Sequence, residues 1–260
     1  MCGISGIISL KKKDSKVVSE VKLMSQKIIH RGPDSTNFNS FNNFHISFNR
    51  LSIVGIKNGE QPFENKNKKI NAWVNGEIYN YKELKEKYLK EYSFKTDSDC
   101  EVVLALYEKF GVEFVKYIRG MFLIVILDIK ENTAYFFRDR IGEKPLYYAF
   151  IDDRFIFSSE LKSFSVFKNS ISKINKSAIY EYLLNQYFIE PNTPFEEIKK
   201  IPAGNYLKIN IKTLKFSLVE YWSIEKIKAV KSSTPFEEIK KGLSECIVLT
   251  SNCNDKPVSV

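Results

Sequence analysis

Cys2 is the residue whose position suggests chemistry most directly. It follows the initiator in Met1-Cys2-Gly3-Ile4, so removal of Met1 would leave one residue with both a thiol and a free α-amine. A thiol with a reference pKa of about 8.5 is mostly protonated at neutral pH, whereas an α-amine near about 7.7–8.0 can accept its proton. Cys2 is therefore a candidate nucleophile with its own base. Taken alone, it is equally a small buried residue of a first strand.

Four further residues have the groups that an amide-cleaving cysteine needs. Asn75 offers a side-chain N–H and Gly76 an uncrowded backbone N–H, so the pair could stabilise an oxyanion. Arg50 and Asp99 have the opposite charges required to hold the carboxylate and the ammonium of an amino acid. Each also has a simpler reading, because Asn-Gly pairs are common in turns and charged residues often form surface ion pairs or caps.

Composition and charge narrow the functional classes. The chain has 260 residues, of which 43% are hydrophobic and 14% aromatic, enough for one large core or for one domain and part of another. The formal net charge is +9, which raises the question of a nucleic-acid partner. Lysines cluster only at residues 11–13 and 66–69, in turn-like stretches. We therefore expect a solvated basic surface and no nucleic-acid binding.

The cysteines and histidines give no sign of a disulfide framework or a metal centre. The four cysteines lack CxxC spacing and a secretory leader, which predicts reduced thiols and a cytoplasmic location. The two histidines, His30 and His45, do not have zinc-ligand spacing, so we expect no metal. The longest apolar run, residues 121–127, is far short of the ~20 residues that span a bilayer, so no membrane insertion is expected. Buried helical positions are expected for Cys100, Cys246 and Cys253.

The hydrophobic pattern predicts an α+β fold. Helices are expected over residues 15–29, 82–92, 98–110, 174–187 and 235–250. Strands are expected over residues 3–10, 46–54, 70–74, 121–128, 133–138, 145–151, 154–158, 206–211 and 216–222, with a turn at residues 75–77 that interrupts the third. Short polar turns between strands indicate antiparallel pairing, and the continuous apolar run at 121–127 indicates a strand covered on both faces.

Two other segments mark boundaries. Residues 30–34, His-Arg-Gly-Pro-Asp, must end the first helix and form a candidate site loop. Residues 226–234 are polar and form a candidate linker, while residues 257–260 read as the opening of a new strand, which indicates a continuation beyond this sequence.

Several motifs resemble, in order, the class II glutamine amidotransferase domain of glutamine-hydrolysing asparagine synthetase. The resemblance covers most of residues 2–222. It includes a Pro at position 33, where glucosamine-phosphate synthases have Tyr, and it departs from the usual family pattern at Phe48, where His is common. The matching motifs are Met1-Cys2-Gly3-Ile4, Arg31-Gly32-Pro33-Asp34, Arg50-Leu51-Ser52-Ile53, Gly59-Glu60-Gln61-Pro62, Asn75-Gly76-Glu77-Ile78-Tyr79-Asn80, Ser98-Asp99, residues 138–148, residues 158–162 and Ile201-Pro202-Ala203-Gly204.

This resemblance implies the N-terminal nucleophile (Ntn) hydrolase fold, a four-layer αββα sandwich of two antiparallel sheets. It implies a glutamine amidotransferase domain over residues 2–222, and a linker with the truncated beginning of an α/β asparagine synthetase domain over residues 223–260. The roles that it carries over are Cys2 as the nucleophile, Asn75 and Gly76 as the oxyanion hole, and Arg50, Ile53, Val54, Asn75, Glu77 and Asp99 as the glutamine site.

The function implied is release of ammonia from glutamine through a Cys2 thioester, for ATP-dependent amidation of aspartate or a related carboxylate. The glutaminase step needs no cofactor, whereas ATP and Mg²⁺ are implied for the synthetase half, which would receive ammonia through an internal channel. A homodimer is possible in this family. The alternatives are a non-catalytic domain that binds glutamine or a partner, and an amidotransferase that acts on an amino sugar or another carboxylate acceptor.

Overall fold

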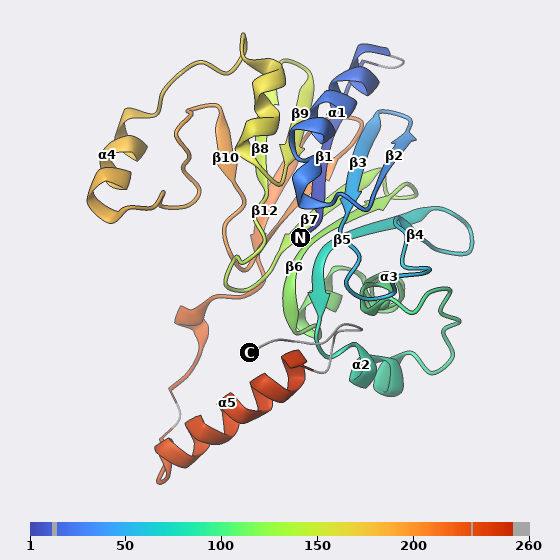
Figure 1. Ribbon diagram of the computed structural model, residues 1–260, viewed down its shortest axis with the longest axis vertical. Helices are drawn as coiled ribbons and strands as arrows, with labels where there is room; N and C mark the ends of the chain where they lie inside the picture. Colours follow the sequence, from blue (N-terminus) through green and yellow to red (C-terminus); the bar gives the residue numbers. More distant parts are fainter. Residues whose placement is uncertain (12–14, 230, 252–260) are drawn as a thin grey trace.

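The computed structural model describes residues 1–11, 15–229 and 231–251. Strands of the described residues form two six-stranded sheets in which all neighbours are antiparallel (Figure 1). The first sheet has the order β10-β8-β9-β1-β3-β2, formed by Ile198–Lys200, Tyr147–Ile151, Arg154–Ser158, Gly3–Ser9, Phe44–Arg50 and Ser35–Phe41. The second has the order β12-β11-β7-β6-β5-β4, formed by Phe216–Glu220, Asn205–Asn210, Thr133–Arg138, Gly120–Asp128, Ile70–Ile78 and Phe63–Glu64.

Helices cover the outer face of each sheet. On the first sheet, α1 (Ser15–Lys27) and the 3-10 helix η4 (Leu161–Phe167) pack against the outer side chains of β1 and β9. On the second sheet, α3 (Val102–Phe110) packs against the outer side chains of β5, β6 and β7. The third apolar cluster lies between the sheets and includes Ile4, Phe44, Trp73 and Phe136. The four-layer αββα sandwich predicted from the sequence is therefore confirmed.

The strand expected to be covered on both faces is β6. Leu123, Val125 and Leu127 contribute to the cluster between the sheets, and Ile124 and Ile126 contribute to the cluster under α3. The side chains of successive residues point to opposite faces of a strand. An apolar run without alternation is what such a position requires.

The prediction of a turn at residues 75–77 is wrong, because β5 runs without interruption from Ile70 to Ile78. Its register with β6 is continuous, from Ile70 opposite Asp128 to Ile78 opposite Gly120. Asn-Gly favours a turn only where the chain is free to reverse. Here, nine residues paired to the central strand of a sheet override the local preference, and Gly76 adopts an extended backbone instead.

Other boundaries also differ from the sequence expectation. Strand β3 ends at Arg50, and residues 51–54 begin a loop, because the amide of Ser52 bonds to Asp34 Oδ2 at 2.7 Å and leaves the sheet. Strand β2, of seven residues, and the short strands β4 and β10 were not predicted. The helices α1, α2 (Tyr81–Tyr88) and α4 (Lys176–Asn185) are shorter than expected, and the helix expected from residue 98 begins as the 3-10 turn η2 (Asp99–Glu101). Two further 3-10 helices, η1 (Ile29–Arg31) and η3 (Gly111–Lys116), follow α1 and α3.

The C-terminal part of the described chain lies outside the sandwich (Figure 1). After the 3-10 turn η5 (Ile224–Lys226) comes α5 (Pro235–Ser251), which has no buried residue. Burial was predicted correctly for Cys100 but wrongly for Cys246, which is exposed on α5. Cys253 and the strand expected at 257–260 lie outside the described residues. The described helices include none long and apolar enough to cross a membrane.

Candidate active site

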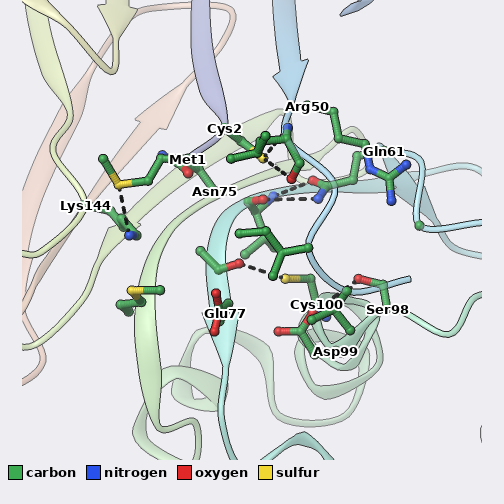
Figure 2. A pocket seen from close by; sticks show the side chains of 17 residues that line it. Met1, Cys2, Arg50, Gln61, Asn75, Glu77, Ser98, Asp99, Cys100 and Lys144 are labelled. Carbon is green, nitrogen blue, oxygen red and sulfur yellow. Dashed lines mark hydrogen bonds between the residues drawn. The ribbon is translucent and has the colours of Figure 1, made fainter. Parts of the chain in front are cut away.

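One pocket gathers all the residues to which the resemblance assigned a role, whereas no residue of the candidate loop 30–34 lines it. It lies where the start of β1, the end of β3, β5 and η2 meet, and its free volume is about 60 Å³ (Figure 2). The residues that line it include Cys2, Arg50, Ile53, Val54, Asn75, Gly76, Glu77 and Asp99. Residues separated by almost a hundred positions in the sequence are therefore neighbours. Met1 also lines this pocket, so its removal would enlarge the volume next to Cys2.

The Cys2 thiol is held by the first residue of the loop after β3. The backbone N–H of Leu51 donates to Cys2 Sγ at 3.3 Å, and Sγ lies 3.6 Å from Leu51 O. Burial raises the pKa of the Cys2 thiol, whereas the hydrogen bond from Leu51, the positive amino terminus and Arg50 lower it. Because burial dominates, the thiol needs a nearby base to become the reactive thiolate.

The amino terminus is anchored beside this thiol. Arg31 Nε donates to Cys2 O at 3.0 Å, and the Arg31 guanidinium pairs with Glu160 at 3.0 Å. Burial, Arg31 and Lys144 lower the pKa of the Met1 amine, while Cys2 and Asp34 oppose them. An amine with a lowered pKa is a better-populated base near neutral pH.

Strand β5 supplies two donors at the pocket. The Asn75 side chain is buried, and its Nδ2 has no hydrogen-bond partner in the described structure. The N–H of Val74 bonds to Gln61 Oε1 at 2.6 Å, and the N–H of Ile78 bonds to Asp99 Oδ2 at 2.7 Å. Because backbone direction alternates along a strand, the N–H of Gly76 points to the same edge, midway between these two. Two N–H groups therefore face the pocket with no recorded acceptor.

Gly76 is a position that only glycine fits. Its φ is +154°, a conformation that L side chains rarely adopt, and a Cβ there would lie 2.0 Å from Met121 O. The absence of a side chain lets the backbone of β5 approach β6 closely and keeps the amide of residue 76 accessible from the pocket.

Arg50 is a buried cation whose recorded partners are neutral. Its side chain is 7% exposed, and its guanidinium donates to Gly55 O at 2.7 Å and to Ile56 O at 3.4 Å. No ion pair of Arg50 is found within residues 1–11, 15–229 and 231–251. A Cβ on Gly59 would come within 2.8 Å of Arg50 Nη2, so glycine leaves the guanidinium room. The surface ion pair considered for Arg50 is therefore ruled out, and a ligand carboxylate would suit this charge.

Asp99 and Glu77 form an acidic pair on the other side of the pocket. Asp99 is 2% exposed and begins η2, and its carboxylate is fixed by the Ile78 N–H. Burial raises the pKa of Asp99, and burial and the neighbouring Asp99 charge raise the pKa of Glu77. Two carboxylates that repel each other in a buried site are stabilised by a cation between them. The pair therefore suits the ammonium of an amino acid.

Lys144 and Gln61 also line this pocket, although sequence reasoning assigned neither a role. The Gln61 side-chain amide pairs with the backbone of Val74 through two hydrogen bonds, of 2.6 and 3.1 Å. Lys144 reaches the pocket from the loop between β7 and β8, and its Nζ lies 3.2 Å from Met1 Sδ (Figure 2). The only signal that could have found them is their place within the matching motifs.

Cys2 immediately precedes β1, an inner strand of the first of two stacked antiparallel sheets, which agrees with the Ntn hydrolase fold that the sequence resemblance implied. Comparison with known families agrees: residues 1–222 match the model of the glutamine amidotransferase domain. The chain belongs to this family.

Relatives and solved structures extend this result. The chain is 40% identical over 234 residues to asparagine synthetase [glutamine-hydrolyzing] 2 of Bacillus subtilis, covering 87% of this chain and 31% of the relative. It is 40% identical over 214 residues to asparagine synthetase [glutamine-hydrolyzing] 1 of the same organism, covering 80% and 33%. The chain thus spans about a third of the length of these relatives.

A solved structure shares the fold. Glutamine phosphoribosylpyrophosphate amidotransferase from B. subtilis superposes with a TM-score of 0.63 at 16% identity, over 86% of this chain and 50% of that one.

Proposed function

We propose that the mature chain hydrolyses the side-chain amide of glutamine, with Cys2 as the nucleophile and its own α-amine as the base. The observation that carries this proposal is the unpartnered Asn75 Nδ2, buried in the pocket that also contains Cys2. A buried donor without an acceptor costs free energy. An oxyanion that forms only during the reaction would satisfy it, which is how differential stabilisation of a transition state works.

The reaction would proceed through a thioester. The α-amine takes the thiol proton while Sγ attacks the amide carbon, and Asn75 and Gly76 donate to the resulting oxyanion. The C–N bond then breaks, the α-ammonium returns its proton to the leaving nitrogen, and ammonia departs. Water, deprotonated by the same amine, attacks the thioester and releases glutamate and the free thiol.

The two ends of the pocket would hold the amino-acid part of glutamine. Arg50 would bind the α-carboxylate, and Asp99 with Glu77 would bind the α-ammonium through charge-assisted hydrogen bonds. Ile53 and Val54, in the loop after β3, would line the wall beside the substrate. These contacts would place the side-chain amide next to Cys2 and would select an amino acid over a simple amide.

We further propose that the chain is the ammonia-producing part of an asparagine synthetase. Residues 223–260 would be the linker and the beginning of a synthetase domain that receives ammonia through a channel and uses ATP and Mg²⁺ to amidate aspartate. The cofactor chemistry would belong to that second half, since the glutaminase step needs only the residues above. The support is the identity to the two asparagine synthetases. We expect a cytoplasmic protein without a nucleic-acid partner.

Glutamine hydrolysis by wild type and three variants tests the glutaminase proposal. Cys2→Ala should abolish glutamate release, and Asn75→Ala should lower kcat by about 100–1,000-fold because one oxyanion donor is lost. Cys246→Ala is the matched control: it removes an exposed thiol on α5 and should leave the rate unchanged. Intact mass establishes that Met1 has been removed. Full activity of Cys2→Ala, or of a preparation that retains Met1, would disprove the mechanism.

A further inference from the structure

Lys144 is a buried cation that the proposed mechanism does not use. Its side chain is 5% exposed and lines the pocket with Cys2 and Glu77. The recorded side-chain partner of its Nζ is Met1 Sδ at 3.2 Å, and a thioether sulfur is a weak acceptor. No carboxylate lies within ion-pair distance of this ammonium among the described residues. Burying an ammonium without a strong acceptor costs free energy. A functional role for this position would explain that cost.

The backbone holds Lys144 in place. Asp139 is fully buried, and its carboxylate accepts the N–H groups of Glu143, Lys144 and Phe122 at 2.9, 3.0 and 3.3 Å. The carbonyl of Lys144 in turn accepts from Arg138 Nε at 3.0 Å. The loop is therefore fixed on both sides of Lys144, and its side chain is aimed at the amino terminus (Figure 2). Such support is typical of groups that a site needs at a defined position.

We propose that Lys144 is a positioning residue of the glutaminase site, whose ammonium disfavours a second positive charge on the Cys2 α-amine and keeps the Glu77 carboxylate negatively charged. This inference rests on the function proposed above. After removal of Met1, the ammonium would face the emptied volume beside the new amino terminus. Like charges held close together in a buried site each disfavour the other, so the terminal amine would remain a free base at lower pH.

The surrounding charges agree with this role. The charged groups that act on the present amino terminus, the Met1 amine one residue before the Cys2 nitrogen, are Cys2, Asp34, Arg31 and Lys144, of which the two cations lower its pKa. Those that act on Lys144 are Glu143, Glu77, Asp139 and Arg31. Lys144 also lowers the pKa of Glu77, against the effects of burial and Asp99. Loss of Lys144 should thus favour protonation of the amine and of Glu77 together.

The pH profile of kcat/KM for glutamine tests the proposal, because its acidic limb reports groups of the free enzyme that must be unprotonated. In Lys144→Met this limb should move to higher pH by about half a unit to one unit. In Lys144→Arg, which keeps the charge, it should stay near the wild-type value. Lys200→Met is the matched control, since Lys200 is a partly buried lysine paired with Glu190 outside this pocket. Its limb should not move.

A uniform loss of activity in Lys144→Met, with the acidic limb unmoved, would overturn the proposal and leave Lys144 a structural role. Equal shifts in Lys144→Met and Lys144→Arg would overturn it too. A second measurement needs no variant and no turnover: trace acetylation of the Cys2 amine by acetic anhydride as a function of pH, read by mass spectrometry. An amine pKa in wild type at or above the ordinary value of about 7.7–8.0 would contradict the proposal. Wild type that binds no glutamine but has a lowered amine pKa would instead count against the glutaminase function.

Discussion

At the scale of single residues, the surroundings of Glu77 lower the stability of the ligand-free fold. Its side chain is 9% exposed and next to the buried Asp99 carboxylate, and no hydrogen bond of Glu77 to another side chain is recorded in the described chain. Lys144 lowers the pKa of Glu77, but burial and Asp99 outweigh this effect, so the charged form stays unfavourable until a ligand cation binds. Proteins commonly accept such a cost where a ligand binds.

Replacement of Glu77 by Gln should therefore stabilise the ligand-free protein at pH 7 while weakening glutamine binding. Because the folded-state pKa of Glu77 is raised above its unfolded value, stability falls as pH rises through that pKa, and the variant should not show this fall. A gain of about 1 kcal/mol would raise Tm by about 2–4 °C in a domain of this size. Thermal unfolding measured from about pH 4 to about pH 8, in steps of about two pH units, tests this expectation.

A lower Tm for Glu77→Gln at neutral pH would contradict this account. Glu83→Gln is the control, since Glu83 is an exposed carboxylate of α2 and its loss should change stability by less than about 0.5 kcal/mol.

The residue types of the site could be anticipated better than their environment. Cys2, Asn75, Gly76, Arg50 and Asp99 each carry a group whose chemistry is evident from the sequence. That Arg50 is buried with neutral partners, or that Asn75 has a free donor, depends on which strands pair. Lys144 could not be singled out at all, because one lysine among 40 basic residues becomes unusual only once a fold buries it.

At the scale of elements, the outer edge of β5 explains where the pocket lies. Strand β4 pairs with only two residues of β5, Ala72 and Asn71. Beyond it, the Gln61 side chain replaces a neighbouring strand by bonding both backbone groups of Val74. At the next edge position the Gly76 N–H is open to the pocket, while its carbonyl accepts from Cys100 Sγ at 3.5 Å, and the following N–H, of Ile78, is bonded to Asp99.

Gln61→Met should therefore destabilise the protein, although the two side chains are similar in size. Val74 is 1% exposed, so its N–H and C=O would lose their partners in a buried site, at a cost of about 1–3 kcal/mol each. Chemical denaturation should give a loss of about 2 kcal/mol or more. The same substitution at Gln26, an exposed position of α1, should change stability by less than about 0.5 kcal/mol. Equal stability of the two variants would show that the Gln61 amide is dispensable.

Strands with strong apolar patterns could be predicted, but edges and short strands could not. The uniformly apolar composition of residues 121–127 is enough to predict the burial of β6. Strand β4 has two residues and β10 has three, too few for a periodic signal. The turn expected at Asn75-Gly76 does not form, because β5 pairs with β6 over its full length. The sequence shows the local preference for a turn but not this partner strand.

At the scale of the whole molecule, the buried apolar surface belongs to the sandwich and not to α5. Three buried apolar clusters belong to the sandwich, whereas Phe236, Ile239, Leu243 and Ile247 of α5 are each more than half exposed. Stability follows burial of apolar surface, so α5 should contribute little to it.

A chain that ends at Lys226 should consequently unfold within about 2 °C of the full chain and should keep its glutaminase activity. A chain that ends at Lys215 is the comparison, because it loses β12 and also Tyr221, whose hydroxyl donates to Arg138 O at 2.6 Å. That shorter chain should lose several degrees. Differential scanning calorimetry on the three proteins decides, and a large drop for the chain ending at Lys226 would show that α5 stabilises the sandwich.

The central position of β1 also affects when Met1 can be removed. Strand β1 is paired along both edges, with β3 and β9, and the residue before it is tied down through Arg31. Met1 is 51% exposed. An aminopeptidase must nevertheless bind the first residues of its substrate in its own cleft, and residues paired on both edges within a sheet are poorly available for this. Removal of Met1, which the proposed mechanism requires, should therefore be faster before β1 pairs with β3 and β9 than after.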